Sequence, residues 1–310
     1  MQLRMAALAI SVVSAAPSAE RVVSGDATVP VTVAGRALRL RIEPAAPGLP
    51  LLPKALAAEL GMKGGGIFAV AVRYRIGKEN VYGRTATARF GWPGRKAARR
   101  KVGWLSRDYV PFANGSIGPA GVPEPVVRFQ LQAARPGEVA LTLPMDSEGG
   151  VAGALFGDWI FLDALVTIGD TPVRMRFDPH SPMTLVTAPA ALALARSQGG
   201  TMTHITGQQE VAFGIVRPYR VMQLARPLIL GGIALSRVGI RVTDDTITGH
   251  IPAEGAAMPA SDPDEIVVTA KSRHPKKGLI VLGTDALAGC STLVFDKPAK
   301  QVRLSCAAGN

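Results

Sequence analysis

Aromatic rings, histidines and long apolar runs are all scarce in this chain of 310 residues. Aromatic side chains make up 5% of the sequence, and there are only four histidines. None of these, His180, His204, His250 or His274, has a Cys, His or Glu partner at metal-ligand spacing, so we expect no metal site. Beyond the N-terminus no stretch is long and apolar enough to be a membrane-spanning helix.

Two common functional motifs are also missing. There is no Gly-x-Ser-x-Gly sequence, which argues against a serine hydrolase of the nucleophile-elbow type. The glycine-rich stretch 61–66 lacks the Lys-Ser/Thr pair of a phosphate-binding loop, and we expect no cofactor. Glycine (34 residues) and proline (24) are frequent in a chain that is 47% hydrophobic. This composition predicts short strands, many turns and one large or two medium domains.

Residues 1–19, MQLRMAALAISVVSAAPSA, combine a basic start, a short apolar run and small residues. This pattern predicts a secretory signal peptide, with cleavage near Ala15 or Ala19. The alternative is an N-terminal anchor helix, but the apolar run is too short for a bilayer core of about 30 Å. We therefore expect an exported, periplasmic protein.

The two cysteines, Cys290 and Cys306, bracket two alternating runs joined by a turn at Pro298. A symmetric hairpin would place them opposite each other, and export would favour a disulfide between them. The alternative is a pair of free buried thiols.

Basic residues exceed acidic ones by 35 to 23, for a net charge of +12. The densest cluster consists of Arg95, Lys96, Arg99, Arg100 and Lys101. In an exported protein this cluster could contact an anionic membrane surface or an anionic polysaccharide, and we expect no nucleic acid partner. The alternative is a solvated turn between strands.

The chain repeats itself. Residues 31–47 (VTVAGRALRLRIEPAAP) align without gaps with residues 166–182 (VTIGDTPVRMRFDPHSP), at an offset of 166 − 31 = 135. Each copy predicts two strands, an acidic residue followed by Pro, and an Ala-rich helix, and the offset continues to Ala55 and Ala190. We therefore expect two β-rich lobes produced by tandem duplication.

The repeat also predicts how the chain is divided. We expect a first lobe at residues 20–150 and a second lobe at residues 151–310. The offset between Gly118 and Gly283 is 283 − 118 = 165, so the second lobe carries about 165 − 135 = 30 extra residues. We assign these to a surface insert at residues 244–277, which is polar and rich in proline.

These residues carry a resemblance to a known family. The strand that ends at Asp178, the Ala-rich helix after it and the segment GLIVLGTDAL before the C-terminal hairpin resemble the retropepsin-like and pepsin-like aspartic peptidases. The resemblance implies a mostly-β, bilobal aspartic-peptidase-like (acid protease) fold. It also implies a catalytic pair, one acid from each lobe, at Glu43 and Asp178.

The two turns depart from the family motif. The family has two Asp residues that share a proton, whereas this chain has Glu43 opposite Asp178. The next position is proline in both copies, where the family has a hydroxyl that bonds across the lobes. The two remaining motif positions hold Ala45 and Ala46 in the first copy and His180 and Ser181 in the second. Ordinary peptidase activity is therefore not expected, although His180 could serve as an acid or base near neutral pH.

The predicted insert contains DPDEIVVTAKSR, residues 262–273, which resembles the TonB box of outer-membrane transporters. The matching residues are Glu265, Ile266, Val267, Val268, Thr269 and Ala270. The resemblance implies that the segment adds a strand to the periplasmic protein TonB. The alternative is an ordinary surface strand or linker.

Two hypotheses follow for function. The first is a catalytically impaired aspartic-peptidase-like protein, a pseudoenzyme that binds a peptide or protein in the periplasm and engages TonB through residues 265–270. The second is a diverged aspartic endopeptidase that uses Asp178 with Glu43.

Overall fold

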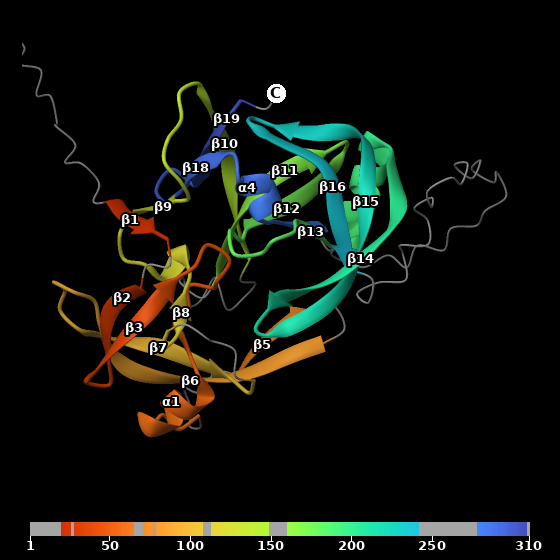
Figure 1. Cartoon of the computed structure of the whole chain (residues 1–310). Coiled ribbons are helices and arrows are strands. Elements are labelled where there is room, and N and C mark those ends of the chain that lie inside the picture. Colours follow the sequence, from red (N-terminus) through yellow and green to blue (C-terminus); the bar gives the residue numbers. More distant parts are fainter. Residues whose placement is uncertain are drawn as a thin grey trace, which may run out of the picture.

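Strands dominate the structure of this chain, a computed structural model shown in Figure 1. The structure describes residues 20–25, 28–64, 71–76, 79–107, 113–148, 160–241 and 278–308. The predicted leader (1–19) and the predicted insert (244–277) lie outside these ranges, as does the expected lobe boundary at residues 150–151.

The first lobe is a seven-stranded sheet with one short helix. Its elements are β2 (Thr28–Val33), β3 (Arg36–Ile42), β4 (Leu51–Leu52), α1 (Lys54–Glu59), β5 (Val72–Ile76), β6 (Glu79–Gly91), β7 (Ala98–Leu105) and β8 (Ser116–Ile117). The strands lie in the order β2-β3-β8-β4-β7-β6-β5. Apolar residues alternate along β2 and β3, so one face of the sheet is buried: Val31, Val33, Leu38 and Leu40 are all in the core.

The second lobe contains a set of elements in the same order. They are β11 (Phe161–Ile168), β12 (Thr171–Phe177), β13 (Leu185–Val186), α3 (Ala188–Gln198), β14 (Gly200–Ala212), β15 (Ile215–Leu230), β16 (Ile233–Arg241), β17 (Gly278–Leu282) and α4 (Thr284–Leu287). Their strands lie in the order β11-β12-β17-β13-β16-β15-β14. The two orders correspond strand for strand.

Pairing directions repeat as well. β3 runs parallel to β8, which is antiparallel to β4, and β12 runs parallel to β17, which is antiparallel to β13. The offset between the starts of β3 and β12 is 171 − 36 = 135, the same as in the sequence repeat. The predicted mostly-β fold, with two lobes and an internal repeat, is confirmed.

The ungapped offset, however, does not continue to Ala55 and Ala190 as expected. Leu51 pairs with Ser116 in the first lobe, and Leu185 pairs with Val281 in the second. The offset between these equivalent positions is 185 − 51 = 134. The first lobe therefore has one extra residue between the acidic turn and the short strand, and the helices align with a shift of one.

The additional length of the second lobe falls mainly between β16 and β17. This connection runs over residues 242–277, whereas the equivalent connection between β7 and β8 runs only over residues 106–115. The longer connection lies where the sequence places the insert.

Five further strands, the joining strands, connect the two lobes (Figure 1). They are β1 (Glu20–Ser24), β9 (Val126–Gln130), β10 (Glu138–Glu148), β18 (Cys290–Asp296) and β19 (Gln301–Ala307). In the order β1-β9-β18-β19-β10 they continue the sheet of the second lobe through β11, which makes twelve strands in all. A short 3-10 helix, η1 (Pro119–Gly121), precedes β9.

The predicted disulfide is confirmed. Cys290 and Cys306 face each other in register across the β18–β19 hairpin and are bonded, and both are fully buried. Among the residues that the structure describes, no helix is long and apolar enough to cross a membrane.

Candidate functional site

The two acidic turns lie at equivalent positions, immediately after β3 and β12. The backbone N–H of Glu43 donates to the carbonyl of Ile117 (3.0 Å), and the N–H of Asp178 donates to that of Leu282 (2.9 Å). Each turn then closes through a bond back to the carbonyl of its acidic residue, from Ala46 in the first lobe (3.2 Å) and from Ser181 in the second (3.1 Å). The repeat therefore positions Glu43 and Asp178 by the same backbone contacts.

Two glycines allow this close packing. A Cβ atom at Gly118 would lie 1.9 Å from the carbonyl oxygen of Ala46, and one at Gly283 would lie 2.7 Å from that of Ser181. Backbone atoms cannot yield as a flexible side chain can. Both positions beneath the acidic turns therefore require glycine.

Asp178 accepts two hydrogen bonds from its own turn. The N–H of His180 donates to Oδ1 (3.1 Å), and the Ser181 hydroxyl donates to Oδ2 (2.8 Å). Ser181 is buried, so this bond is shielded from water. In the first lobe Ala46 stands at the position of Ser181 and has no hydroxyl to offer Glu43. The two acids are thus equivalent in backbone position but not in hydrogen bonding.

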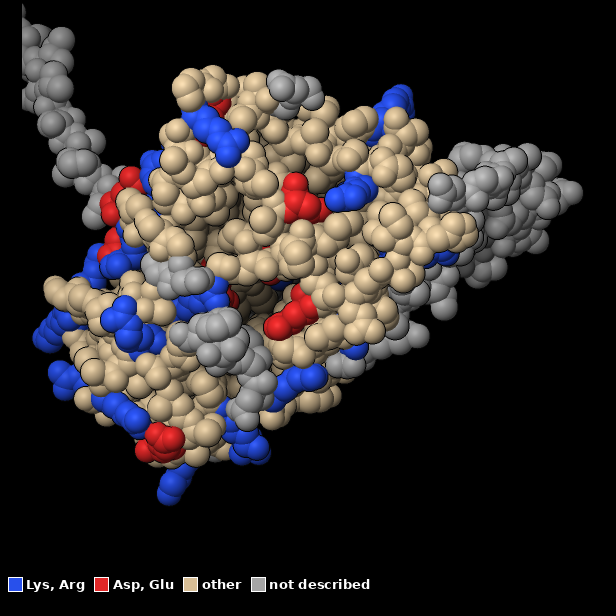
Figure 2. Space-filling model, viewed as in Figure 1, with Lys and Arg blue, Asp and Glu red and all other residues tan. Residues whose placement is uncertain are grey.

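Burial raises the pKa of Glu43 to about 7; the charge of Arg41 opposes the rise, and those of Asp178 and Glu210 add to it. Its side chain is 26% exposed. The contribution of Asp178 places the two predicted acids within electrostatic reach of each other. Figure 2 shows a hollow where the two lobes meet, with acidic and basic side chains at its edge.

Arg41, which the sequence did not single out, connects the two turns. Its Nε lies 3.4 Å from Oε1 of Glu43. Its Nη2 lies 2.7 Å from Nε2 and 3.0 Å from Nδ1 of His180, across the lobes. The site therefore contains a mixed-charge cluster of Arg41, Glu43 and His180 beside Asp178.

The repeat explains why Arg41 points this way. Its equivalent in the second lobe, Arg176, forms a two-bond ion pair with the buried Asp163 (2.8 and 2.9 Å). The position equivalent to Asp163 is 163 − 135 = 28, which is Thr28. Because the first lobe lacks this carboxylate, Arg41 pairs with Glu43 and His180 instead. Comparison of the two copies could have revealed this arginine from the sequence.

Gln209 on β14 holds the segment that follows the second turn. Its side chain accepts from the N–H of Met183 and donates to the carbonyl of the same residue, both at 3.0 Å. A small cavity beside Ser181, lined also by Gln209, Glu210 and Arg241, has a volume of about 10 Å³. That is room for about one water molecule.

The tip of the β14–β15 hairpin reaches across to the first lobe, a contact that we call the interlobe clasp (Figure 1). Phe213 packs against Tyr74 of β5 with 4.8 Å between ring centroids, and Tyr74 also contacts Phe161 at 5.9 Å. The rest of this apolar cluster is formed by Leu49, Leu51, Val72, Ile76, Val81, Leu105 and Ile215. The clasp therefore joins the two lobes by apolar packing.

The turn of the clasp has an unusual sequence. Phe213 and Gly214 have φ angles of 55° and 70°, as in a two-residue type I′ hairpin turn. Such turns favour Asn or Asp at the first position, and a bulky aromatic residue there is strained. Glu210 stabilises the turn by accepting the N–H of Gly214 at 2.7 Å.

The predicted basic cluster is divided by the fold. Arg100 does not face solvent as a member of a docking surface would: it donates to the carbonyls of Gly121 (2.8 Å) and Gly48 (3.0 Å) and lies over the ring of Phe90. Strand alternation turns Arg100 to the inner side of the sheet, whereas Arg99 and Lys101 point to the other side.

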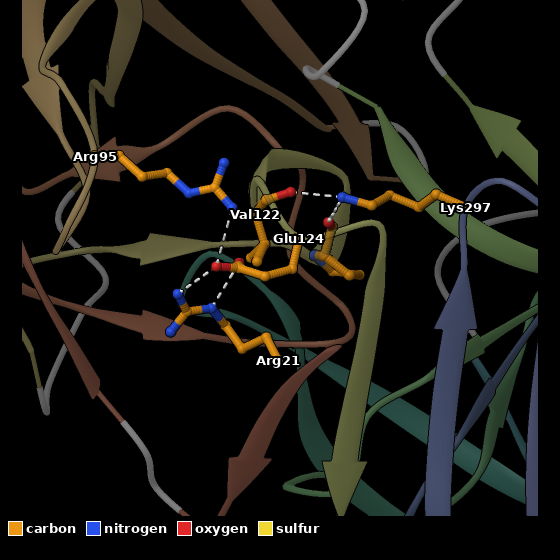
Figure 3. Close-up of polar contacts among 6 residues, drawn as sticks. Arg21, Arg95, Val122, Glu124 and Lys297 are labelled. Carbon is orange, nitrogen blue, oxygen red and sulfur yellow. Dashed lines mark hydrogen bonds and ion pairs between the residues drawn. The ribbon is translucent and has the colours of Figure 1, made fainter. Parts of the chain in front are cut away.

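Arg95 belongs to a network at the base of the joining strands (Figure 3). Glu124 accepts two hydrogen bonds from Arg21, both at 2.7 Å, and lies 3.6 Å from Arg95. Burial would raise the pKa of Glu124, but the bond from Arg21 and the two cationic charges hold it below its usual range. Lys297 donates to the carbonyls of Val122 and Pro119. The network attaches β1 and the β18–β19 turn to the loop before β9.

Two predictions about binding sites concern other parts of the chain. The TonB-box-like residues Glu265 to Ala270 lie outside the described ranges. Within the described ranges, no three His, Cys, Asp or Glu side chains come together as a metal-binding group.

Comparisons with known proteins add no argument about this chain. No family model matches the chain, and no curated protein matches it. Among solved structures, the chain is similar to the aspartic proteinase from Irpex lacteus, with a TM-score of 0.38 and 12% identity over 91% of this chain and 94% of that chain. A likeness this distant carries no argument, so function has to be inferred from the side chains of this chain.

Proposed function

We propose that this chain is an exported, aspartic-peptidase-like protein without ordinary peptidase activity, and that it binds a peptide or protein where its two lobes meet. The observation that carries this proposal is the mixed-charge cluster of Arg41, Glu43 and His180 beside Asp178. The disulfide between Cys290 and Cys306 and the leader-like residues 1–19 support export.

The cluster argues against the shared-proton mechanism of an aspartic peptidase. That mechanism needs two carboxyl groups that hold one proton and one water between them. Here a permanent cation lies 3.4 Å from Glu43, where it opposes the rise in the pKa of Glu43 that burial causes and so competes with a shared proton. Glu43 is also one methylene longer than Asp, and a displacement of about 1 Å can reduce a catalytic rate about a hundredfold.

A peptide ligand has groups that suit this cluster. Arg41 can bond to a carboxylate or a backbone carbonyl, and Glu43 and Asp178 can accept N–H groups or pair with a basic side chain. A ligand of this kind would compete with the contact between Arg41 and His180.

The absence of catalysis is tested by incubating the purified protein with a peptide library at pH values from 3 to 8 and analysing the products by mass spectrometry. We expect no cleavage above that of the Asp178→Asn variant. Cleavage that Asp178→Asn abolishes would overturn the non-catalytic proposal.

Binding is tested by retention of the same library on immobilised protein at neutral pH. We expect a retained set of peptides that Arg41→Gln reduces about tenfold, the value of one charged hydrogen bond. Arg226→Gln is the matched control, because this exposed arginine lies in the second lobe and bonds only to the carbonyl of Ser197 in the described contacts. Equal loss in both variants, or no retention at all, would contradict a site at Arg41.

A diverged aspartic endopeptidase is the second candidate, and one observation favours it. Burial raises the pKa of Glu43 to about 7, and the charge of Asp178 adds to the rise, so Glu43 holds a proton near neutral pH as a general acid must. If this candidate is right, peptide cleavage depends on both Glu43 and Asp178 and falls as Glu43 ionises above pH 7.

The TonB-box-like segment is a separate part of the proposal, supported by its sequence. A peptide of residues 262–273 is expected to bind the C-terminal domain of TonB by strand addition. A peptide of the same composition with residues 265–270 scrambled is the control. No detectable binding at millimolar peptide would reject TonB as a partner without affecting the interlobe site.

A further inference from the structure

One face of the first lobe presents a set of arginines that the cleft does not use. The register of the sheet shows which residues share this face, because directly opposed residues point the same way. Pro30 opposes Arg39, Thr32 opposes both Ala37 and Gly91, Arg89 opposes Arg99, and Thr87 opposes Lys101. We call this set the basic face.

The charges of the basic face are accessible. Arg39, Arg89 and Arg99 are exposed, and Lys101 is half-buried. Arg39 bonds to the hydroxyl and carbonyl of Thr28, which hold its guanidinium on this side of the sheet. Figure 2 shows Lys and Arg gathered over the lobe that Figure 1 places at the lower left, the one with β2, β3, β6 and β7.

Arg89 and Arg99 lie opposite each other, and the repulsion between their charges destabilises the fold. They are directly opposed on antiparallel strands, an arrangement in which like charges destabilise a sheet. In the described part of the chain, neither guanidinium forms an ion pair that would offset this repulsion. An anionic partner outside the chain would remove the repulsion.

We propose that the basic face docks onto an anionic lipid surface. The face is broad, since it spans β2, β3, β6 and β7, and its basic residues are separated by the short side chains of Pro30, Thr32 and Thr87. None of these is an aromatic ring on which a sugar or a base could stack. Guanidinium groups bind phosphate oxygens through a planar fork of N–H donors, so phosphate headgroups suit these arginines.

This surface differs from the cluster that the sequence indicated. Arg100 faces the interior of the lobe, and Arg95 is bound to Glu124, so neither belongs to the basic face. Arg39 and Arg89, which are distant from the cluster in sequence, replace them. The proposal is independent of any ligand at the interlobe site.

The test is sedimentation of the full chain with vesicles of phosphatidylglycerol and phosphatidylethanolamine at low salt. Each basic side chain near an anionic surface contributes about fivefold to binding, so Arg89→Gln with Arg99→Gln should weaken it about 25-fold. Vesicles of phosphatidylcholine alone and about 0.5 M salt should both abolish binding of the unaltered chain.

Arg196→Gln with Arg237→Gln is the matched control. It removes two exposed charges from the second lobe, where these residues lie on α3 and β16, and it should change binding by no more than about twofold. The paired Arg89 and Arg99 variant should melt at the same temperature as the unaltered chain or higher, because it relieves a repulsion.

Equal weakening by the two double variants would show attraction to net charge alone and would overturn the basic face. Binding to a soluble anionic polysaccharide that depends on Arg89 and Arg99, without binding to vesicles, would assign the face to a different partner and overturn the membrane proposal.

Discussion

Nη2 of Arg41 lies 2.7 Å from Nε2 of His180, so a side chain from the end of β3 contacts the turn that follows β12. Guanidinium nitrogens can only donate, and the imidazole nitrogen must therefore accept. The contact joins the two copies of the repeat at their acidic turns. Its two residues occupy different positions in the repeat, since Arg41 precedes its turn and His180 lies within the other turn.

Replacement of His180 by Ala should lower the free energy of unfolding by about 1 kcal/mol, because the variant loses the contact with Arg41 between the lobes. His204→Ala is the control, since His204 is exposed on β14, and it should stay within about 0.5 kcal/mol of the unaltered chain. Urea denaturation at pH 8 measures both values. Equal stability of the two variants would mean that the contact contributes nothing to lobe association.

Glu43 should make stability depend on pH. Its folded pKa of about 7 lies above the ordinary value of 4.5, so the folded state holds the proton more tightly than the unfolded state. The free energy of unfolding therefore falls as pH rises from about 4.5 to 7, by up to about 3 kcal/mol. Glu43→Gln cannot titrate and should be more stable than the unaltered chain at pH 8 but not at pH 4.

The comparison uses urea denaturation at both pH values. Glu59→Gln is the matched control, because Glu59 forms an exposed ion pair with Arg36 at 2.7 Å, and its replacement should change the free energy of unfolding by less than about 1 kcal/mol. The same stability change at pH 4 and pH 8 for Glu43→Gln would contradict a raised pKa.

At Phe213 in the interlobe clasp, the residue preference of the turn and the packing of the side chain have opposite effects on stability. Asn suits the first position of a type I′ turn, so Phe213→Asn would stabilise a hairpin that served only as a connection. We expect it to lower the free energy of unfolding by about 3 kcal/mol, since Phe213 is buried against Tyr74. Hydrogen exchange in residues 205–217 should also become faster.

Ile205→Asn is the corresponding control on the same hairpin. Ile205 is 59% exposed and lies away from the clasp cluster, so the change should cost less than about 1 kcal/mol. An increase in stability on Phe213→Asn would show that the contact between the hairpin tip and β5 does not hold the lobes together.

The disulfide between Cys290 and Cys306 should stabilise the folded chain by about 3 kcal/mol. It closes a loop with a sequence separation of 16, and loops of about this size give that value when the unfolded chain is constrained. The variant with both cysteines replaced by serine should therefore unfold at lower urea concentration. Treatment of the unaltered chain with a reductant should give the same shift, which the serine variant should not show.

Much of the fold could be predicted from the sequence because the repeat encodes it twice. The alternation in residues 31–42 and 166–177 predicted four strands, and the spacing of Cys290 and Cys306 predicted a hairpin and its disulfide. The change of offset from 135 to 134 after the first turn could not be predicted, because an extra residue inside a loop does not alter the apolar periodicity of the strands on either side. The pairing of β1 with β9 was also hidden, since contacts so distant in sequence depend on the whole sheet.

The candidate site was only partly predictable. The turn motif alone predicts Glu43, Asp178 and Ser181. Arg41 could not be predicted from the motif, because it is available to the site only since Thr28 replaces the carboxylate that Asp163 provides in the second lobe. Phe213 was missed for a different reason. A Phe-Gly pair does not resemble the Asn-Gly turns that mark hairpins, because here packing against Tyr74 outweighs the local preference.

The position of β19 has a consequence for the order in which the protein is made. Residues 301–307 lie between β18 and β10, in the interior of the larger sheet. Until residues 301–307 have left the ribosome, β18 and β10 both present open edges to solvent and no continuous sheet joins them. Completion of the larger sheet therefore waits for β19, the last of the described strands in chain order, although β9 and β10 are made much earlier.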